Sequence, residues 1–455
     1  MATRRPIELT PEQLALSEAR KAKKLKLSEN PPAPEPATNL ILSRPWISLN
    51  SDPEPGRIKV HTWNMLAQCL VRRELFPTSD CLKAGQRLPM LHAELLAQDS
   101  DILCLQEVDN LEKLLPPLQS KYTTHYTAGP GKKHGCMILF KKDGFEKQSE
   151  RLVQYDQEEI RDEGSDAFRR GLSFKTRNIA SIVALKNRSK SGPEGVIVGT
   201  THAFWHPKYT YERCRQVGIF KREVGKFATE HHLEHWPCVI AGGIDSIFQV
   251  QSPVLTRFLD FNFGPDDPAY SLLMSEPLTK EQRERLEASR VVHVSIDPTV
   301  PPTTSGPVGD DEDQAVDPDR VITNARRATP SDGLLTDDEL VALFALGKPL
   351  KSAYDEGLAH PRASASDIRT FGDRVSCEPD MKGSNEPEYT SFTFFWKTVL
   401  DYIFVSQPTV ITGLLAPHRA EHLGRGLPLK GICGSDHISL SAELSFSNKG
   451  QASLD

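Results

Sequence analysis

Five short motifs follow one another along the chain, and each joins an apolar run to a polar residue at the expected end of a strand. They are Thr62-Trp63-Asn64, Ile102 to Glu107, Thr200-Thr201-His202, Leu400 to Phe404 with Asp401 inside it, and Ser435-Asp436-His437. Because the ends of neighbouring strands lie along one edge of a sheet, we expect these polar side chains to gather there. The nearly continuous apolar run from Ile102 to Gln106 predicts a strand buried on both faces. Helices are expected over Leu82 to Ala97 and over Thr336 to Phe344, with Thr336 as the cap of the second. This alternation of strands and helices predicts an α/β fold.

Composition divides the chain into a tail and one large domain. Residues 1–55 are poor in apolar residues and rich in Pro, Lys and Glu, which predicts a disordered or helical basic tail and linker. Alternating strand and helix patterns predict a domain over residues 56–446, followed by a short tail at 447–455. Within the domain, residues from about 296 to 335 form an acidic, low-complexity insert that we expect to be disordered.

The net charge of −6 is distributed unevenly. The segment from Asp297 to Glu339 holds 11 acidic and 3 basic residues, so the remainder carries a net charge of +2. Net charge therefore neither favours nor excludes a nucleic-acid ligand. The basic run Arg20–Lys26, in an expected helix over residues 9–28, indicates either a nuclear-import or RNA-contacting patch or a solvated charged helix.

Other features of the composition favour an intracellular protein. No apolar run approaches the roughly 18 residues that a membrane span needs, so we expect no membrane association. The eight cysteines are scattered without a CxxC pair, which favours reduced thiols and does not predict a zinc site.

The residue types at the strand ends suit metal-assisted phosphate chemistry. Magnesium takes few carboxylates, together with water and phosphate oxygens, so Glu107 could supply the protein ligand or simply cap a turn. His437 is the candidate for acid–base work, and the adjacent Asp436 is expected to orient or charge its imidazole. Asn64, His202 and Asp401 end the other motifs. Together they predict a magnesium-dependent phosphodiester hydrolase, with Mn²⁺ as a substitute metal.

Four further side chains are candidates for substrate binding. Trp205 and Trp396 could stack on nucleobases at the mouth of the site, or could be buried by packing. Arg213 and Arg215 lie on an expected helix after the His202 motif, where they could contact phosphate or support the scaffold.

In combination, these motifs resemble those of the endonuclease/exonuclease/phosphatase superfamily, in its nocturnin, Angel and carbon-catabolite-repressor deadenylase branch. Asn64 to Gln68, followed by Arg72 to Pro77, is similar to the fungal Ngl-type RNA exonucleases. The likeness covers about residues 57–446. It implies the DNase I-like fold, a four-layer α/β sandwich in which two packed mixed, mostly antiparallel sheets are flanked by helices.

The resemblance also implies an activity and roles for the motif residues. A member of this branch would be a 3′-to-5′ exoribonuclease that releases 5′-mononucleotides, trimming poly(A) or ribosomal RNA precursors. By matching positions, Glu107 would bind magnesium, Asn64 and His202 would hold the scissile phosphate, Asp401 would support the metal–water network, and His437 would face the transition state. The alternatives are a phosphatase of a nucleotide cofactor or phosphoinositide, and a catalytically degenerate RNA-binding protein.

The resemblance implies partners and a compartment as well. We expect RNA as the substrate and a monomeric chain. Because no leucine-rich repeat precedes the domain, we expect no stable membership of the large deadenylation complex. The cytoplasm, the nucleus or the nucleolus would host the reaction.

One motif of the branch is interrupted in this chain. The family pattern Gly-Asp-Phe-Asn supplies a catalytic Asp and a phosphate-holding Asn, whereas this chain continues from Gly242 into Gly243-Ile244-Asp245. Asp260-Phe261-Asn262 follows shortly afterwards. Joining Gly242 directly to Asp260 restores the pattern, and Asp260 and Asn262 then become the expected catalytic residues.

We interpret residues 243–259 as a retained intron. The genetic code permits splice-site sequences at both ends of this segment and a branch point at Leu255-Thr256, and a segment of 17 residues preserves the reading frame. The alternative is a genuine insertion. In either case the segment separates a strand end from its catalytic turn, so we expect the chain as given to be weakly active or inactive.

Overall fold

The computed structural model describes residues 40–50, 56–189, 191–244, 264–303, 322–364, 367–378 and 380–446. The chain divides into two units, Met1–Leu40 and Ile41–Asp455. The helices and strands of the described residues belong to the second unit.

A mixed seven-stranded sheet forms one half of the fold, in the order β1-β16-β17-β2-β3-β5-β4. Only β2 and β3 in this sheet run parallel. Its strands are β1 (Trp46–Ser48), β2 (Ile58–Asn64), β3 (Ile102–Val108), β4 (Tyr122–Ala128), β5 (Gly135–Lys141), β16 (Thr409–Leu415) and β17 (Leu440–Phe446).

A six-stranded sheet forms the other half, in the order β12-β15-β9-β8-β7-β6, and here only β8 and β9 run parallel. Its strands are β6 (Phe145–Gln154), β7 (Ile179–Asn187), β8 (Gly195–Ala203), β9 (Cys238–Ile244), β12 (Leu350–Ser352) and β15 (Asp401–Ser406). Two small ribbons lie outside these sheets, namely β10 (Val291–His293) with β11 (Ala325–Arg327), and β13 (Ser391–Phe392) with β14 (Lys397–Thr398).

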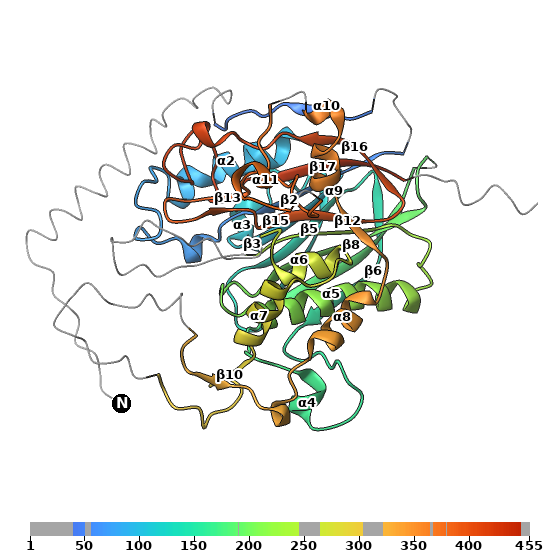
Figure 1. Cartoon of the computed structure of the whole chain (residues 1–455). Helices are drawn as coiled ribbons and strands as arrows, with labels where there is room; N and C mark the ends of the chain where they lie inside the picture. The colour runs from blue at the N-terminus through green and yellow to red at the C-terminus, as the bar shows by residue number, and fades with distance from the viewer. Residues whose placement is uncertain are drawn as a thin grey trace, which may run out of the picture. The chain divides into compact units, whose positions relative to one another are not determined.

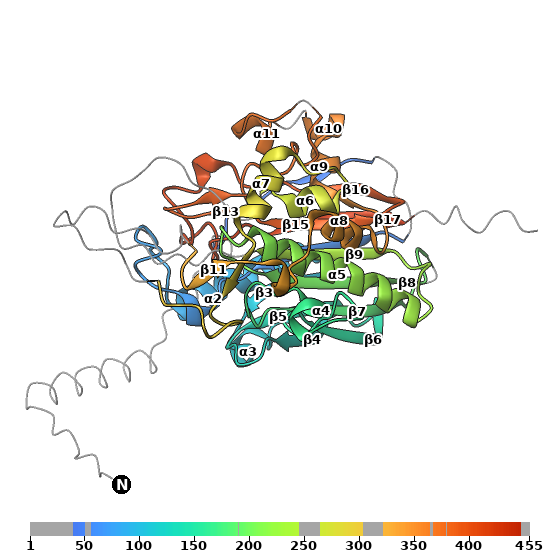
Figure 2. The ribbon, with the colours of Figure 1, turned by 60° about the horizontal axis from the view of Figure 1, so that its bottom comes forward.

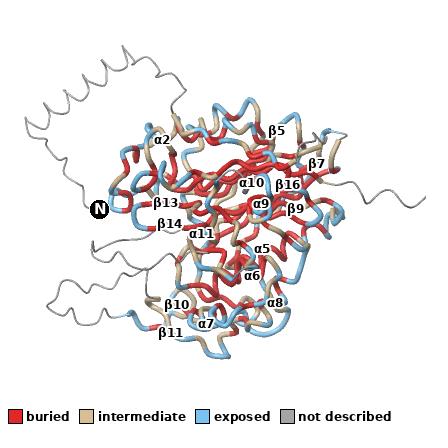
Figure 3. The backbone as a smooth tube through the Cα atoms, turned by 45° about the horizontal axis from the view of Figure 1, so that its top comes forward, coloured by how far each residue is buried: buried red, intermediate tan, exposed pale blue. Residues whose placement is uncertain are grey.

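The two sheets pack face to face, and helices cover their outer faces (Figures 1 and 2). Apolar side chains such as Val60 and Ile102 from one sheet meet Val198 and Ile403 from the other in a common core. A second core joins the six-stranded sheet to α5 (Thr210–Glu230), α6 (Pro268–Leu273), α7 (Lys280–Ala288) and α8 (Asp337–Ala345). A third lies under α2 (Ala84–Ala97) and α3 (Leu111–Leu114). Figure 3 shows the inner strands as buried. The predicted α/β sandwich is confirmed.

Local sequence explains where α8 begins. Thr336, the expected cap, accepts a hydrogen bond from the Glu339 amide at the start of α8, and Glu339 reciprocates in a capping box. The expected helix from Leu82 is observed as α2. The remaining helices are short: α4 (Asp166–Arg170), α9 (Ala353–Leu358), α10 (Pro361–Ser364) and α11 (Phe371–Arg374), with 3₁₀ turns η2 (Gln68–Leu70), η5 (Pro330–Asp332) and η6 (Ala420–His422).

The folded part differs from the composition-based expectation in two places. The domain begins earlier than the expected residue 56, since β1 pairs with β16 and the Trp46 ring packs under the Lys59 ammonium group. Part of the acidic segment is also ordered, since β11 pairs with β10 and Arg326 binds both Asp297 and Asp332. The expected helix over residues 9–28 and most of the suspected intron, residues 245–259, lie outside the described residues.

Two further expectations concern the compartment. All eight cysteines are free thiols, and six of them are buried. Within the described ranges, no helix is both long enough and apolar enough to cross a membrane.

Candidate active site

Strands from both sheets bring polar residues to one edge of the sandwich. Asn64 ends β2, and Glu107 and His202 stand next to the last residues of β3 and β8. Asp401 instead begins β15, and His437 precedes β17, so the expectation that all five residues follow strand ends is wrong for these two. Both strands run antiparallel to their neighbours, and an antiparallel strand brings its beginning to the edge where its neighbour ends.

Glu107 lies in a bulge of β3, where the register against β5 shifts between Leu105 and Val108. Its backbone φ of 52° lies in the left-handed region, which is unfavourable for a side chain of this kind. The Asn64 Nδ2 atom donates to Glu107 Oε1 at 3.0 Å, and the Ala67 amide donates to Oε2 at 2.9 Å. These bonds hold a buried carboxylate in one orientation at the edge of the site.

His202 and Asn64 both approach this carboxylate. The His202 Nδ1 atom lies 4.0 Å from Glu107 Oε1, and its imidazole remains partly exposed. The Ser435 hydroxyl donates to the Asn64 carbonyl at 2.7 Å, which ties the last motif to the first. The structure therefore brings together three residues that the sequence placed in separate motifs.

His437 is oriented by Asp401. Its Nδ1 atom lies 2.7 Å from Asp401 Oδ2, and both side chains are buried. We expected Asp436 in this role, but Asp436 lies in a bend of the backbone, and β15 brings Asp401 from another part of the chain to the His437 ring. Asp436 is buried elsewhere, where its carbonyl accepts the Phe392 amide and its Oδ1 accepts the Ser435 hydroxyl at 3.3 Å.

Arg87 of α2 supports the loops that carry these residues. Its guanidinium donates to the carbonyls of Met65, Leu66 and Gly434, the last at 2.7 Å. Burial lowers the pKa of Arg87, and the negative charges of Asp436 and Glu107 oppose this shift. No pattern in the sequence pointed to this residue, because its partners are backbone carbonyls distant in the chain.

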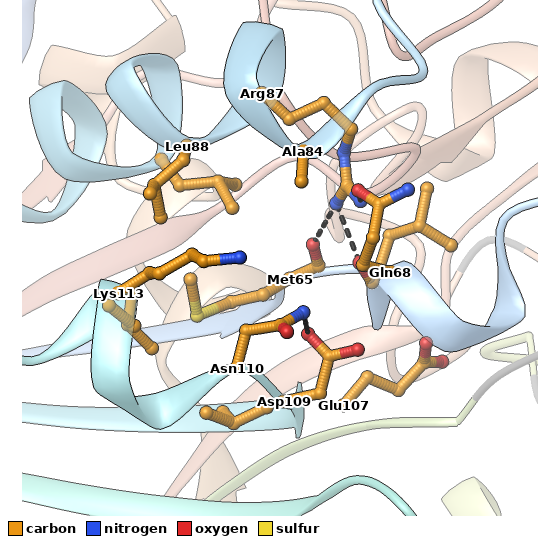
Figure 4. A pocket seen from close by; sticks show the side chains of 13 residues that line it. Met65, Gln68, Ala84, Arg87, Leu88, Glu107, Asp109, Asn110 and Lys113 are labelled. Atoms are coloured by element: carbon orange, nitrogen blue, oxygen red, sulfur yellow. Dashed lines mark hydrogen bonds between the residues drawn. The ribbon is translucent and has the colours of Figure 1, made fainter. Parts of the chain in front are cut away.

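A pocket with an open volume of about 420 Å³ borders Glu107 (Figure 4). Its lining contains leucines and Met65 as well as several polar side chains. Those that Figure 4 labels are Gln68, Arg87, Glu107, Asp109, Asn110 and Lys113.

The interrupted motif falls between His202 and Asp401. In the register of the six-stranded sheet, Gly243 of β9 is paired with His202 on one side and with Asp401 on the other. Gly242 precedes it, and a Cβ atom there would lie 2.4 Å from the Thr201 carbonyl oxygen, so only glycine fits. A glycine, which has no carboxylate, therefore lies between His202 and Asp401 in the sheet. Asp260 and Asn262, the expected catalytic pair, lie outside the described residues.

Arg213 and Arg215 belong to the scaffold. The Arg213 side chain is only 2% exposed and binds Asp267, the N-cap of α6, at 2.9 Å. Arg215 is fully buried and binds Glu212 at 3.1 Å as well as the carbonyls of Tyr155 and Arg170. We therefore withdraw the expectation that these two arginines contact substrate. The helical pattern could not distinguish an inward from an outward arginine.

Replacing Arg213 by Met is expected to lower the free energy of unfolding by about 3–5 kcal/mol, because Asp267 would keep a buried charge without its partner. Urea denaturation measures this loss. The control is Lys226→Met on the exposed side of the same helix, which should change stability by less than about 0.5 kcal/mol. Unchanged stability together with weaker binding of the substrate would instead return Arg213 to substrate binding.

The aromatic candidates separate into buried and exposed residues. Trp396 is 4% exposed and donates from its indole to Ser391, so it packs inside the protein and is not available for stacking. Its neighbours Phe394 and Phe395 are 39% and 37% exposed. Trp205 is partly exposed and packs against Phe204.

His134 is a residue of this edge that sequence reasoning missed. Its ring centroid lies 6.3 Å from that of His202. His134 directly precedes β5, which runs antiparallel to β3. His134 therefore lies at this edge of the sheet although it stands at the beginning of a strand. A search restricted to strand ends cannot find such a residue.

Comparisons with known proteins agree with this arrangement. The model of the Endonuclease/Exonuclease/phosphatase family matches residues 61–437. The RNA exonuclease NGL2 of Saccharomyces cerevisiae is 28% identical, over 96% of this chain and 89% of its own length. A protein named as a probable RNA exonuclease of Schizosaccharomyces pombe is 27% identical, over 85% and 76%. The crystal structure of ANGEL2, described as a 2′,3′-cyclic phosphatase, has a TM-score of 0.54 at 19% identity, covers 89% of this chain and 99% of its own, and shows the same fold.

Proposed function

The chain belongs to the endonuclease/exonuclease/phosphatase family, and we propose that within it this protein is a magnesium-dependent 3′-to-5′ exoribonuclease releasing 5′-mononucleotides. The observation that carries the proposal is the joint presence of Glu107, Asn64 and His202 beside the pair of His437 and Asp401. The names of the yeast relatives favour RNA over other phosphodiesters.

The donor set fits a hard cation with few protein ligands. Within the described residues, no group of three or more His, Cys, Asp or Glu side chains could enclose a metal. Magnesium commonly binds through one or two carboxylates and completes its shell with water and phosphate oxygens. Glu107 would hold it. Asp401 Oδ1 is buried without a hydrogen bond from a described residue, which suits a bound water of that shell. The metal would supply positive charge to the reacting phosphate.

Other side chains of this protein would bind the phosphate and stabilise the transition state. The Asn64 amide and the His202 imidazole would donate to non-bridging phosphate oxygens, because both stand beside Glu107. Asp401 accepts the Nδ1 proton of His437, which fixes the imidazole tautomer and stabilises its protonated form. His437 would then donate from Nε2 to the charge that develops in the transition state.

The exposed aromatic pair gives the RNA end a place to stack. The rings of Phe394 and Phe395 are 5.0 Å apart and nearly perpendicular, and the Arg425 guanidinium lies 5.2 Å from the Phe394 ring. Stacking on such rings is tolerant of base identity. This agrees with a trimming enzyme that accepts successive nucleotides.

A 5′-labelled, A-tailed RNA tests the proposal directly. With Mg²⁺ we expect a ladder of products shortened from the 3′ end, and with EDTA we expect none. The test uses the full chain beside its form lacking residues 243–259.

Two other results would contradict the proposal. If both folded forms leave the RNA intact but release phosphate from a phosphorylated nucleotide cofactor or a phosphoinositide, the protein is a phosphatase. If they bind RNA without turnover, it is a degenerate RNA-binding protein.

A further inference from the structure

Three exposed cations beside the candidate active site have no acidic partner in the part of the chain that the structure describes. Lys133 lies in the turn between β4 and β5, and Lys175 and Arg177 lie in the loop before β7. Among the described residues, none of these three side chains forms an ion pair or a hydrogen bond. Arg290, by contrast, is neutralised by Asp337 at 2.6 Å. This positive charge is therefore available to a ligand.

The two loops that carry these cations are held against each other. A Cβ atom at Gly129 would lie 2.0 Å from the Arg177 carbonyl oxygen, and one at Gly131 would lie 3.4 Å from the Arg177 guanidinium. Lys132 bonds to the Asn178 side chain across the same junction. The strands that follow these loops, β5 and β7, belong to different sheets and face each other (Figure 2). The junction therefore forms a continuous surface.

The backbone that presents Arg177 is fixed. Its φ of 56° lies in the left-handed region, which a non-glycine residue adopts at some cost. Asp156 maintains this conformation by accepting the amides of Thr176 and Arg177 at 3.1 and 2.8 Å. The Asp156 carboxylate also belongs to this surface, and these backbone amides engage it. The surface keeps a net positive charge.

This surface adjoins the reacting groups. His134 follows Lys133 in the chain, and its ring lies 6.3 Å from the His202 ring. Burial lowers the pKa of Lys132, whereas the nearby charges of Asp156 and Glu107 oppose the shift. A polyanion leaving the His202 end of the site would therefore meet cations at once.

We propose that Lys133, Lys175 and Arg177 form a phosphate track that binds the backbone of single-stranded RNA upstream of the scissile phosphate. The proposal rests on the proposed function and adds the path of the substrate. Contacts of this kind are independent of sequence and release counterions, so they make binding depend on salt. The track also distinguishes RNA of several nucleotides from a dinucleotide, because a dinucleotide has no phosphate besides the scissile one to place on it.

The test uses the full chain, a fluorescent oligoadenylate of about 15 nucleotides and EDTA, so that binding is measured without cleavage. The variant Lys133→Gln/Lys175→Gln/Arg177→Gln should reduce the slope of log affinity against log salt by about 2, since each phosphate contact contributes about 0.7. Lys133→Gln alone should reduce it by about 0.7. Turnover of a dinucleotide and the melting temperature should not change.

The matched control removes three positive charges at the other end of the sheets, as Lys142→Gln/Lys186→Gln/Arg188→Gln. It should keep the wild-type slope. An unchanged slope in the track variant, or an equal reduction in the control, would overturn the track while leaving the exoribonuclease proposal intact. A wild-type chain that neither binds nor shortens RNA would overturn both.

Discussion

Deleting residues 243–259 is expected to raise kcat/KM for an A-tailed RNA by about 10²- to 10⁴-fold, the usual contribution of a positioned acid–base group. The reason lies in the register of β9. The deletion joins Gly242 to Asp260, which then takes the place of Gly243 between His202 and Asp401. Paired residues project from the same face of a sheet with Cβ atoms about 4.5–5.5 Å apart. The new carboxylate would therefore face both of these residues.

An isosteric change shows whether the carboxylate causes the gain. When Asp260→Asn is added to the deletion form, the activity should fall back towards that of the full chain. Because this variant and the deletion form have the same length, the loss would be due to the carboxylate and not to the length of the loop. A second variant, Gly243→Asp in the full chain, places a carboxylate at the same register position without shortening the loop and should recover part of the rate. Equal rates for the full chain and the deletion form would show that the segment is a tolerated insertion.

The same segment makes a prediction about the transcript. If residues 243–259 are a retained intron, amplification of messenger RNA across this region should give a product 51 nucleotides shorter than the one that encodes this chain. A product of the longer length alone would contradict the intron, and the kinetic comparison would still measure what the segment does.

Replacing Glu107 by Gln in the deletion form is expected to lower kcat by at least about 10²- to 10³-fold, which is typical for the loss of a preorganised electrostatic group. Gln keeps the shape of the side chain and one carbonyl acceptor for the Asn64 or Ala67 donor, so the fold should persist. It removes the charge that would hold magnesium.

Binding of the metal provides a readout independent of catalysis. Added Mg²⁺ should raise the melting temperature of the parent deletion form, because a ligand that binds only the folded state stabilises it. The Glu107→Gln variant should show no such rise. Glu112→Gln, which removes an exposed carboxylate on α3 nearby, should behave as the parent does. If Glu107→Gln keeps the Mg²⁺-induced rise and the rate, Glu107 is not the metal ligand.

Much of the fold was predictable because its signals are local. The continuous apolar run from Ile102 to Gln106 predicted a strand buried on both faces, and β3 is such a strand. The Thr336 cap predicted the start of α8. β1 was missed because three residues without a long apolar run carry little pattern, and its place in the sheet comes from pairing with a strand more than 350 residues later in the chain.

By itself, the sequence determined the family, the two-sheet sandwich and the kinds of polar group at its edge, because short motifs and apolar periodicity are properties of neighbouring residues. Only the tertiary structure decided that Asp401 orients His437 and that Glu107 adopts a left-handed conformation. It also decided that Trp396 is buried whereas the neighbouring Phe394 and Phe395 are exposed. These outcomes depend on strand register, strand direction and packing between segments far apart in the chain. The physical reason is that the partner of a side chain usually comes from a distant segment of the chain, and a short local motif does not specify which segment will lie opposite it.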